Sequence, residues 1–351
     1  MNPLLPPPET IPVAWGWLKL LLMTVFPLHL LFMNAMLGST VIALYSSLGN
    51  DEASHDLSRR LAGIVPFLVA FAVNLGVASL LFIQVLYGRL FYTSSILMAL
   101  FWLGVIPLLM TAYYLLYLYD FRYAQLGRWG VPVAAAAVFI FLGIAFIYSN
   151  NMTLMLAPHQ WTGYFANQSG TILNMAESAL WPRYLHFIIG GTAIGSLFVA
   201  IYGKSLGIRA AQTGEAALSV GMRLFTILTM VQVVDGLWFL QSLPQGVRKG
   251  FMGGDTPATL LFFIGMLLVL AVIMAAAVRS VYLTASLAVS LVFVMVSIRD
   301  HLRSAYLRPF FLPDRVAAAP QYLPMIMFFC LLVIAATVIA WMLVKGARSA
   351  E

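Results

Sequence analysis

Long apolar stretches follow one another along the whole chain, with only short polar segments between them. Each stretch has about the 20 residues that a helix needs to cross a bilayer, and none shows the alternation of a transmembrane β-strand. In hydrocarbon, every backbone N–H and C=O must be bonded within its own segment, which favours helices. The pattern therefore predicts an all-α polytopic bundle of about nine transmembrane helices, at 13–47, 61–87, 92–119, 130–149, 181–203, 217–243, 257–277, 279–298 and 322–346.

The same pattern predicts a single integral membrane domain over residues 1–351, with no internal repeat. Its polar parts are an N-terminal tail (1–12), a surface loop (150–180), a polar connection (299–321) and a C-terminal tail (347–351). The boundary between the seventh and eighth helices depends on Arg279 alone, because apolar residues continue on both sides of it.

The orientation of the bundle follows from the distribution of Lys and Arg, which favour cytoplasmic loops. The whole-chain distribution barely decides the question, but the 150–180 loop contains neither residue. A segment without basic residues is typical of the translocated side. The sequence thus predicts an N-terminus outside and a C-terminus inside, with the 150–180 loop folded on the outer membrane surface.

Composition agrees with a lipid environment and narrows the classes of function. The chain is 62% hydrophobic and 9% charged, against about 25% charged residues in a typical soluble domain. Its net charge of +7 comes from basic residues scattered among short loops, so it indicates no nucleic-acid partner. The one cysteine, Cys330, lies in an apolar run and has no partner for an internal disulfide.

The five histidines are the first candidates for chemistry. His55 and His159 lie in predicted loops, where a solvated ring is the simpler reading. His29, His186 and His301 lie at or near membrane depth, where a polar ring is costly and tends to be functional. His301 belongs to an Arg-rich helix end and is expected to face lipid headgroups or haem propionates.

His186 begins the fifth predicted span in a pattern that suits haem. Arg183 lies one turn before it on the same face, and Gly190 and Gly191 follow about one turn later. The imidazole would bind iron, the glycines would leave room for the macrocycle, and the arginine would meet a propionate. An alternative remains open, in which the glycines form a helix-packing face and the histidine bonds a neighbouring carbonyl.

Two other residues are candidate iron ligands. Met266 follows a glycine in an apolar span, and His/Met pairs are known axial ligands of haem. Most of the 18 methionines must be core filling, however. His29 lies midway along the first span, two residues after Pro27, so a hydrogen-bonded core histidine is an equal alternative for it.

Acidic side chains are almost absent from the spans. Asp235 is the only acid clearly within one, whereas Asp120 and Glu177 are marginal or in loops. Reduction of dioxygen inside a membrane needs protons, which chains of Asp, Glu and His usually deliver. The scarcity of such residues argues against oxygen chemistry in this chain.

The order of these features resembles subunit I of the cytochrome bd quinol oxidases, at a distant level and over nearly the whole length. The resemblance is carried by His29, the run Asn74-Leu75-Gly76-Val77-Ala78-Ser79 with Phe82-Ile83-Gln84 after it, Arg183 with His186 and Gly190-Gly191, and Asp235-Gly236. It implies nine spans in the bacterial inner (cytoplasmic) membrane with the N-terminus outside. It also implies that His186 and Met266 ligate a low-spin haem b, and that His29 ligates one haem of an oxygen-reducing pair.

The sequence departs from the family where the oxygen and quinol sites should be. The third span, 94–119, has no glutamate, and the family's long quinol-binding insert is reduced to 241–256. The arginine beside the methionine ligand is replaced by Ile264 or its neighbours, and the glutamate expected around Ser297 is missing. Both the oxygen site and the usual quinol site are therefore in doubt.

The expected function is that of a bd-like membrane cytochrome b, an electron-transfer subunit of a larger quinol-oxidoreducing complex in a respiratory chain. It would carry electrons between quinone and a periplasmic c-type cytochrome or iron–sulfur protein. One haem b is expected, a second at His29 is left open, and no catalytic residue is assigned. The alternatives are a complete quinol-oxidising, oxygen-reducing subunit and a haem-free membrane anchor or transporter.

Overall fold

The computed structural model describes residues 10–350, and in this part of the chain the architecture is helical throughout, with one isolated bridge between Ile11 and Ala318. The long helices are α1 (Trp15–Ser47), α2 (Glu52–Leu97), α3 (Ala99–Phe121), α5 (Gly130–Met155), α6 (Leu180–Ser205), α7 (Ala211–Ser242), α9 (Thr256–Ala277), α10 (Val281–Leu307) and α11 (Tyr322–Ala350). The short ones are α4 (Tyr123–Leu126), η1 (Gly127–Trp129), η2 (Pro158–Phe165), η3 (Ile208–Ala210), α8 (Gln245–Lys249), η4 (Gly250–Gly254) and η5 (Pro313–Arg315).

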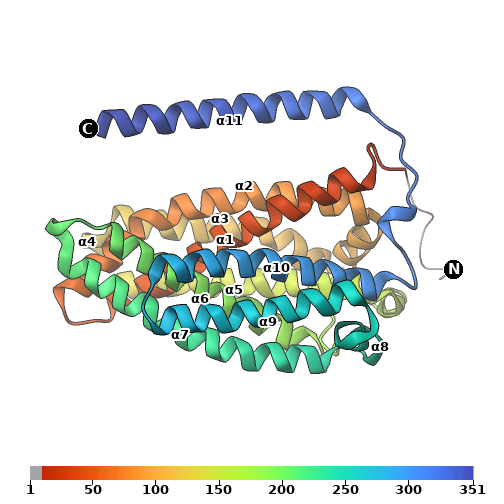
Figure 1. The fold of residues 1–351 in the computed structure, drawn as a ribbon, viewed down its shortest axis with the longest axis horizontal. Coiled ribbons are helices and arrows are strands. Elements are labelled where there is room, and N and C mark those ends of the chain that lie inside the picture. Colours follow the sequence, from red (N-terminus) through yellow and green to blue (C-terminus); the bar gives the residue numbers. More distant parts are fainter. Residues whose placement is uncertain (1–9, 351) are drawn as a thin grey trace.

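Nine helices of the described part are long and apolar enough to cross a membrane, so the predicted all-α polytopic bundle is confirmed. Figure 1 shows them lying side by side along one long axis, with α1 beginning and α11 ending at opposite ends of the molecule. The predicted boundary at Arg279 is also confirmed. This residue lies between α9 and α10 with a positive φ of 55°.

Several helices run further than the sequence predicted: α5 continues six residues past its expected end at 149, and α7 begins six residues before its expected start at 217. The second span was expected to end at 87, but α2 continues to Leu97 with a kink at Tyr87 (φ −127°, ψ 23°). Arg89 lies in the gap expected between the second and third spans, but it is part of α2, and its guanidinium lies over the Phe311 ring at 4.7 Å. Likewise, the expected connection 299–321 is helical as far as Leu307.

The two ends of the chain that the sequence predicted as tails lie partly outside the described residues. The N-terminal tail 1–12 falls mostly on residues 1–9, which lie outside the described residues. At the other end, the expected tail 347–351 continues the helix as far as Ala350. Its last residue, 351, also lies outside the described part.

Local sequence explains where α2 and α9 begin. The Asp51 carboxylate accepts hydrogen bonds from the backbone N–H and the hydroxyl of Ser54, at 2.9 and 2.8 Å. These bonds stabilise the ionised carboxylate and hold the pKa of Asp51 below its ordinary value. Asp255 caps α9 in the same way, through the N–H of Ala258 at 3.2 Å.

Glycines set the close approach of the central helices. A Cβ atom on Gly195 of α6 would lie 2.5 Å from the Cα of Gly38 on α1, and one on Gly221 of α7 would lie 2.5 Å from the Ser196 carbonyl oxygen. Small residues at such crossings let transmembrane backbones pack without a hydrophobic driving force. As a result, α6 packs closely between α1 and α7.

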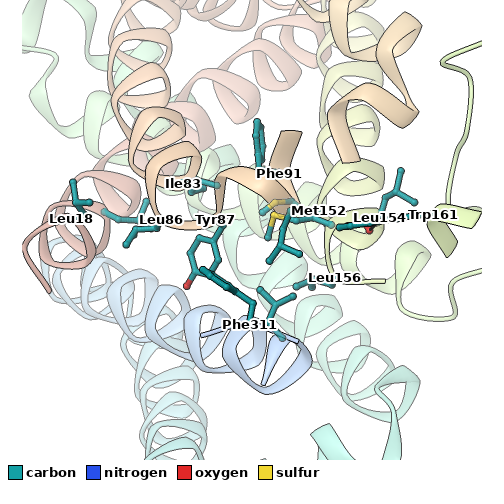
Figure 2. Packing of buried hydrophobic residues seen from close by; sticks show 14 of the residues in the cluster. Leu18, Ile83, Leu86, Tyr87, Phe91, Met152, Leu154, Leu156, Trp161 and Phe311 are labelled. Atoms are coloured by element: carbon teal, nitrogen blue, oxygen red, sulfur yellow. Dashed lines mark hydrogen bonds between the residues drawn. The ribbon is translucent and has the colours of Figure 1, made fainter. Parts of the chain in front are cut away.

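A hydrophobic cluster joins α1, α2, α5, η2 and the end of α10 at one end of the bundle. Figure 2 shows Tyr87 and Phe311 side by side, with Met152, Leu154 and Trp161 beyond them. The Trp161 indole donates to the Leu154 carbonyl at 2.9 Å. The 150–180 segment is therefore folded over this end of the bundle, against which its buried side chains pack.

The last helix, α11, stands apart from the others (Figure 1). Its side chains from 322 to 346 are almost all exposed, and the ring of Phe329 lies 6.4 Å from that of Trp17 on α1. An apolar helix with so few contacts to its own chain presents its surface to lipid.

Candidate functional site

A histidine–aspartate pair joins α6 to α7 near the end of the bundle over which the 150–180 segment is folded. The Nδ1 atom of His186 lies 3.0 Å from Oδ2 of Asp235. The aspartate side chain is only 6% exposed, whereas that of the histidine is 31% exposed. In the neutral tautomer that donates from Nδ1 to the carboxylate, the lone pair of Nε2 is free. A carboxylate in this position both orients an imidazole and raises its basicity as a ligand.

One face of α7 holds the histidine from several sides. Gln232 donates from Nε2 to the His186 carbonyl at 2.8 Å. A Cβ on Gly236 would lie 3.3 Å from Cε1 of the ring, and the Phe239 ring centroid is 6.0 Å from the imidazole centroid. These residues recur at three- and four-residue spacing with Asp235, so they share one helix face. That face fixes the position of His186.

The beginning of α6 is incompletely covered by the rest of the chain. Every residue from 183 to 190 is half-buried, whereas Pro182 and Gly191 on either side are buried. His186 lies in the middle of this stretch. A half-exposed imidazole hydrogen-bonded to a carboxylate is costly against hydrocarbon. A further group that covered the exposed part of His186 would remove this cost.

Arg183 contributes an unmatched donor to the same stretch. Its guanidinium lies over the Phe239 ring at 5.2 Å. Its Nε atom is buried and has no hydrogen-bond partner among the described residues. A buried donor without a partner costs about 1–3 kcal/mol, so this nitrogen is suited to an acceptor supplied from outside the chain.

Two more arginines, Arg299 and Arg303 of α10, lie within electrostatic range of Arg183. We call the three the arginine cluster. Two acids lie within electrostatic range of the cluster: Glu177, near Arg183, and Asp300, which Lys19 of α1 engages at 2.7 Å while Arg303 stays at 3.9 Å. Two carboxylates against three arginines and a lysine leave excess positive charge, which favours an anionic group nearby.

The glycines after His186 serve helix packing. A Cβ on Gly190 would lie 3.0 Å from Nε2 of Gln232, and one on Gly191 would lie 3.1 Å from Oδ1 of Asn34. Both positions face neighbouring helices at contact distance. The space that was expected beside them for a macrocycle is therefore filled by α7 and α1. These glycines form a helix-packing face, as in the alternative that the sequence left open.

Met266 lies on α9 with 40% of its surface exposed. It follows Phe262 by four residues and so lies on the same helix face. Phe262 packs against the hydrophobic cluster that also contacts Phe239 of α7. Met266 therefore lies on the same face of α9 as Phe262. The helix α9 itself packs mainly on α10 and α7 rather than on α6, the helix that carries His186.

His29 lies between α1 and α2, where its Nδ1 is 2.8 Å from the carbonyl oxygen of Ala72. Gly76 allows this contact, because a Cβ there would lie 2.8 Å from Cε1 and 3.0 Å from Nδ1 of the ring. This is the geometry of a hydrogen-bonded core histidine, and it also leaves Nε2 without a proton. His301 similarly faces its own helix, with Nδ1 3.0 Å from the Ser297 carbonyl.

Gly76→Ala is expected to destabilise the protein by about 1–3 kcal/mol, because the new methyl group overpacks the His29 ring. Thermal unfolding of the purified protein in detergent measures this loss. Gly104→Ala is the matched control, since a Cβ at Gly104 meets nothing within 4 Å. Equal midpoints for the two variants would contradict the described position of the ring.

The sequence singled out His186 and Asp235 but could not show that they meet. Arg183, also singled out, lies one turn before His186 and packs on the Phe239 ring. Gln232 was missed, although its spacing from Asp235 would have placed it on the same face of α7. The pair of Lys19 and Asp300 was also missed, because no local pattern links residues on the first and tenth helices.

No group of three or more His, Cys, Asp or Glu side chains within residues 10–350 is arranged to hold a bare metal ion. A haem brings its own four nitrogen ligands and needs only one or two axial side chains. The sequence matches no protein-family model and no curated protein.

Proposed function

We propose that this protein is a bd-like membrane cytochrome b that carries electrons between quinone and a partner redox protein in a bacterial inner membrane. The observation that carries the proposal is the pair of His186 and Asp235. In the tautomer that donates to this buried carboxylate, the ring has a free Nε2, and its helix α6 is long and apolar enough to cross a membrane. This arrangement is typical of histidines that ligate metals.

The surroundings of His186 fit a haem in two further respects. Residues 183 to 190 are only half-buried, and the His186 side chain itself is 31% exposed, so part of it is left uncovered by the rest of the chain. The arginine cluster, Arg183 included, supplies positive charge for propionates. When bound, haem b supplies one-electron transfer between Fe(III) and Fe(II).

Each residue then has a distinct part. His186 would be the axial ligand, Asp235 would fix its ring, and Arg183 would pair with a propionate. Met266 is proposed as the second axial ligand, on the strength of the resemblance to the cytochrome bd family. His29 is proposed as the ligand of a second haem, since its Nδ1 bond to a carbonyl is the usual way to fix a ligating imidazole.

The scarcity of acids supports an electron carrier over an oxygen-reducing enzyme. In α3 the one acid is Asp120, next to the last residue of the helix. Proton delivery to a buried oxygen site needs a chain of such groups. We therefore propose a separate acceptor, a periplasmic c-type cytochrome or iron–sulfur protein, docked at the end of the bundle nearest His186.

Anaerobic addition of a short-tail quinol to the purified full-length protein tests this function. Reduction of a low-spin haem band without oxygen uptake on later aeration is the expected result. Oxygen uptake that is coupled to quinol oxidation would favour the terminal-oxidase alternative. A haem that stays oxidised with quinol, yet is reduced by dithionite, would contradict the proposed donor.

Asp235→Asn is expected to lower the affinity for haem about 10- to 100-fold, the usual effect of removing a partner of a ligating histidine. The amide no longer stabilises the imidazole as a strong ligand, although the shape of the side chain is kept. Haem titration of the apo-protein, followed by absorption, measures the change. An unchanged affinity would mean that the contact with His186 serves helix packing alone.

A further inference from the structure

A cavity of about 170 Å³ lies where the 150–180 segment meets the ends of α7 and α10. Its walls come from the end of α5, the segment after it, the beginning of α6 and the two helix ends. They include His159, Glu177, Arg183 and Tyr306, with Phe310 beside them. An engineered apolar cavity of about 150 Å³ binds benzene, so this one has room for a single six-membered ring.

Two buried polar atoms in the cavity walls have no hydrogen-bond partner among the described residues. They are Nε of Arg183 and the hydroxyl oxygen of Tyr306. The first is a donor only, whereas the second both donates and accepts. Two orphaned groups in one cavity indicate a ligand that carries at least two polar atoms, because each unsatisfied group is costly.

The other titratable groups of the cavity indicate the charge of that ligand. Glu177 lines it together with Arg183, and His159 lies nearby on η2. Inside the cavity, the Glu177 carboxylate disfavours an anion, and the Arg183 guanidinium disfavours a cation. A neutral ring with oxygen atoms that accept in one redox state and donate in the other matches Arg183, Tyr306 and Glu177.

We infer that this cavity binds the head group of a quinone or quinol. The inference rests on the proposed function and supplies its substrate site. Arg183 and Tyr306 donate to the quinone oxygens, and Glu177 accepts from a quinol hydroxyl. Arg183 precedes His186 by one helical turn, about 5 Å along the axis, so the cavity adjoins the proposed haem. The arginine has five N–H donors, enough for a propionate and the cavity together.

Photolabelling of the full-length protein with an azidoquinone locates the binding site directly. Mass spectrometry of the digested protein is expected to find the label within 153–183 and 302–311. Excess decylubiquinone should remove it. Label confined to other segments, or label that decylubiquinone does not displace, would overturn the assignment.

Two conservative variants test the individual contacts. Tyr306→Phe keeps the ring and removes the hydroxyl, so it should weaken quinone and quinol binding alike by about 3- to 10-fold. Glu177→Gln should weaken quinol binding by a similar factor and leave quinone binding nearly unchanged, because only quinol has a proton to donate. Tyr282→Phe is the matched control, since Tyr282 is an exposed residue near the other end of α10.

The outcomes separate this inference from the proposed function. Site-specific label in a protein without haem absorption would leave the cavity assignment standing and contradict the cytochrome. A normal haem spectrum with no specific label would contradict the cavity assignment alone. Co-purification of a phospholipid that blocks labelling, and labelling that does not recover after delipidation, would assign the cavity to lipid.

Discussion

The variant His186→Ala is expected to lose the low-spin haem absorption entirely. The substitution removes the ring nitrogen that would bind iron, and it leaves the buried Asp235 carboxylate facing an empty space. Millimolar imidazole should restore the band, because the free ligand fits the space that the side chain vacated and meets the same carboxylate. Reduced-minus-oxidised absorption spectra of the purified variant, with and without imidazole, measure both effects.

A matched control separates the loss of a ligand from general damage. His55 lies in the first turn of α2 and is exposed, so His55→Ala should retain the wild-type spectrum. Far-ultraviolet circular dichroism should show equal helix content for both variants. An unchanged low-spin band in His186→Ala would show that iron is bound elsewhere.

Gly195→Ala is expected to cause the largest loss of stability among single-methyl changes. A Cβ at this position would lie 2.5 Å from the Gly38 Cα and closer still to the Asn34 carbonyl oxygen. Both neighbours are backbone atoms, so relief requires α1 and α6 to separate. Overpacking of this kind costs about 1–3 kcal/mol and occasionally more, which thermal unfolding in detergent would register as a lower midpoint.

Gly143→Ala is the control, because here the added methyl group is expected to leave the stability unchanged or to raise it. Nothing lies within 4 Å of a Cβ at Gly143 in α5. Alanine is favoured over glycine in a helix by up to about 1 kcal/mol, so this variant should be as stable as the parent or slightly more stable. A midpoint for Gly195→Ala that matches that of Gly143→Ala would contradict the close crossing of α1 and α6.

The helices were predictable from the sequence because lipid imposes a simple length and polarity rule on each span. The rule placed the boundary at Arg279 correctly. It failed after residue 87, where the second span was expected to end, because α2 continues past Arg89 to Leu97. The long side chain of Arg89 reaches the Phe311 ring, so α2 continues through this position. It also ended the eighth span too early, before the Asp300 pair with Lys19.

The site was predictable residue by residue but not as an arrangement. His186 and Asp235 were each singled out as rare polar groups in an apolar span, but their contact depends on the rotation of α7 against α6, which hydropathy does not encode. The glycines after His186 have a sequence pattern that suits both a cofactor and a helix crossing. The close contacts of Gly190 with Gln232 and of Gly191 with Asn34 show that these glycines serve helix packing.

The reduced-minus-oxidised absorption spectrum of the purified wild-type protein, expressed with ample haem precursor, tests the central claim most directly. If the imidazole that Asp235 holds on α6 binds iron, the preparation is coloured and shows the sharp α band of a low-spin b-type haem. A correctly folded but colourless protein would contradict the electron-carrier proposal and leave a helical membrane bundle whose polar pair has another purpose.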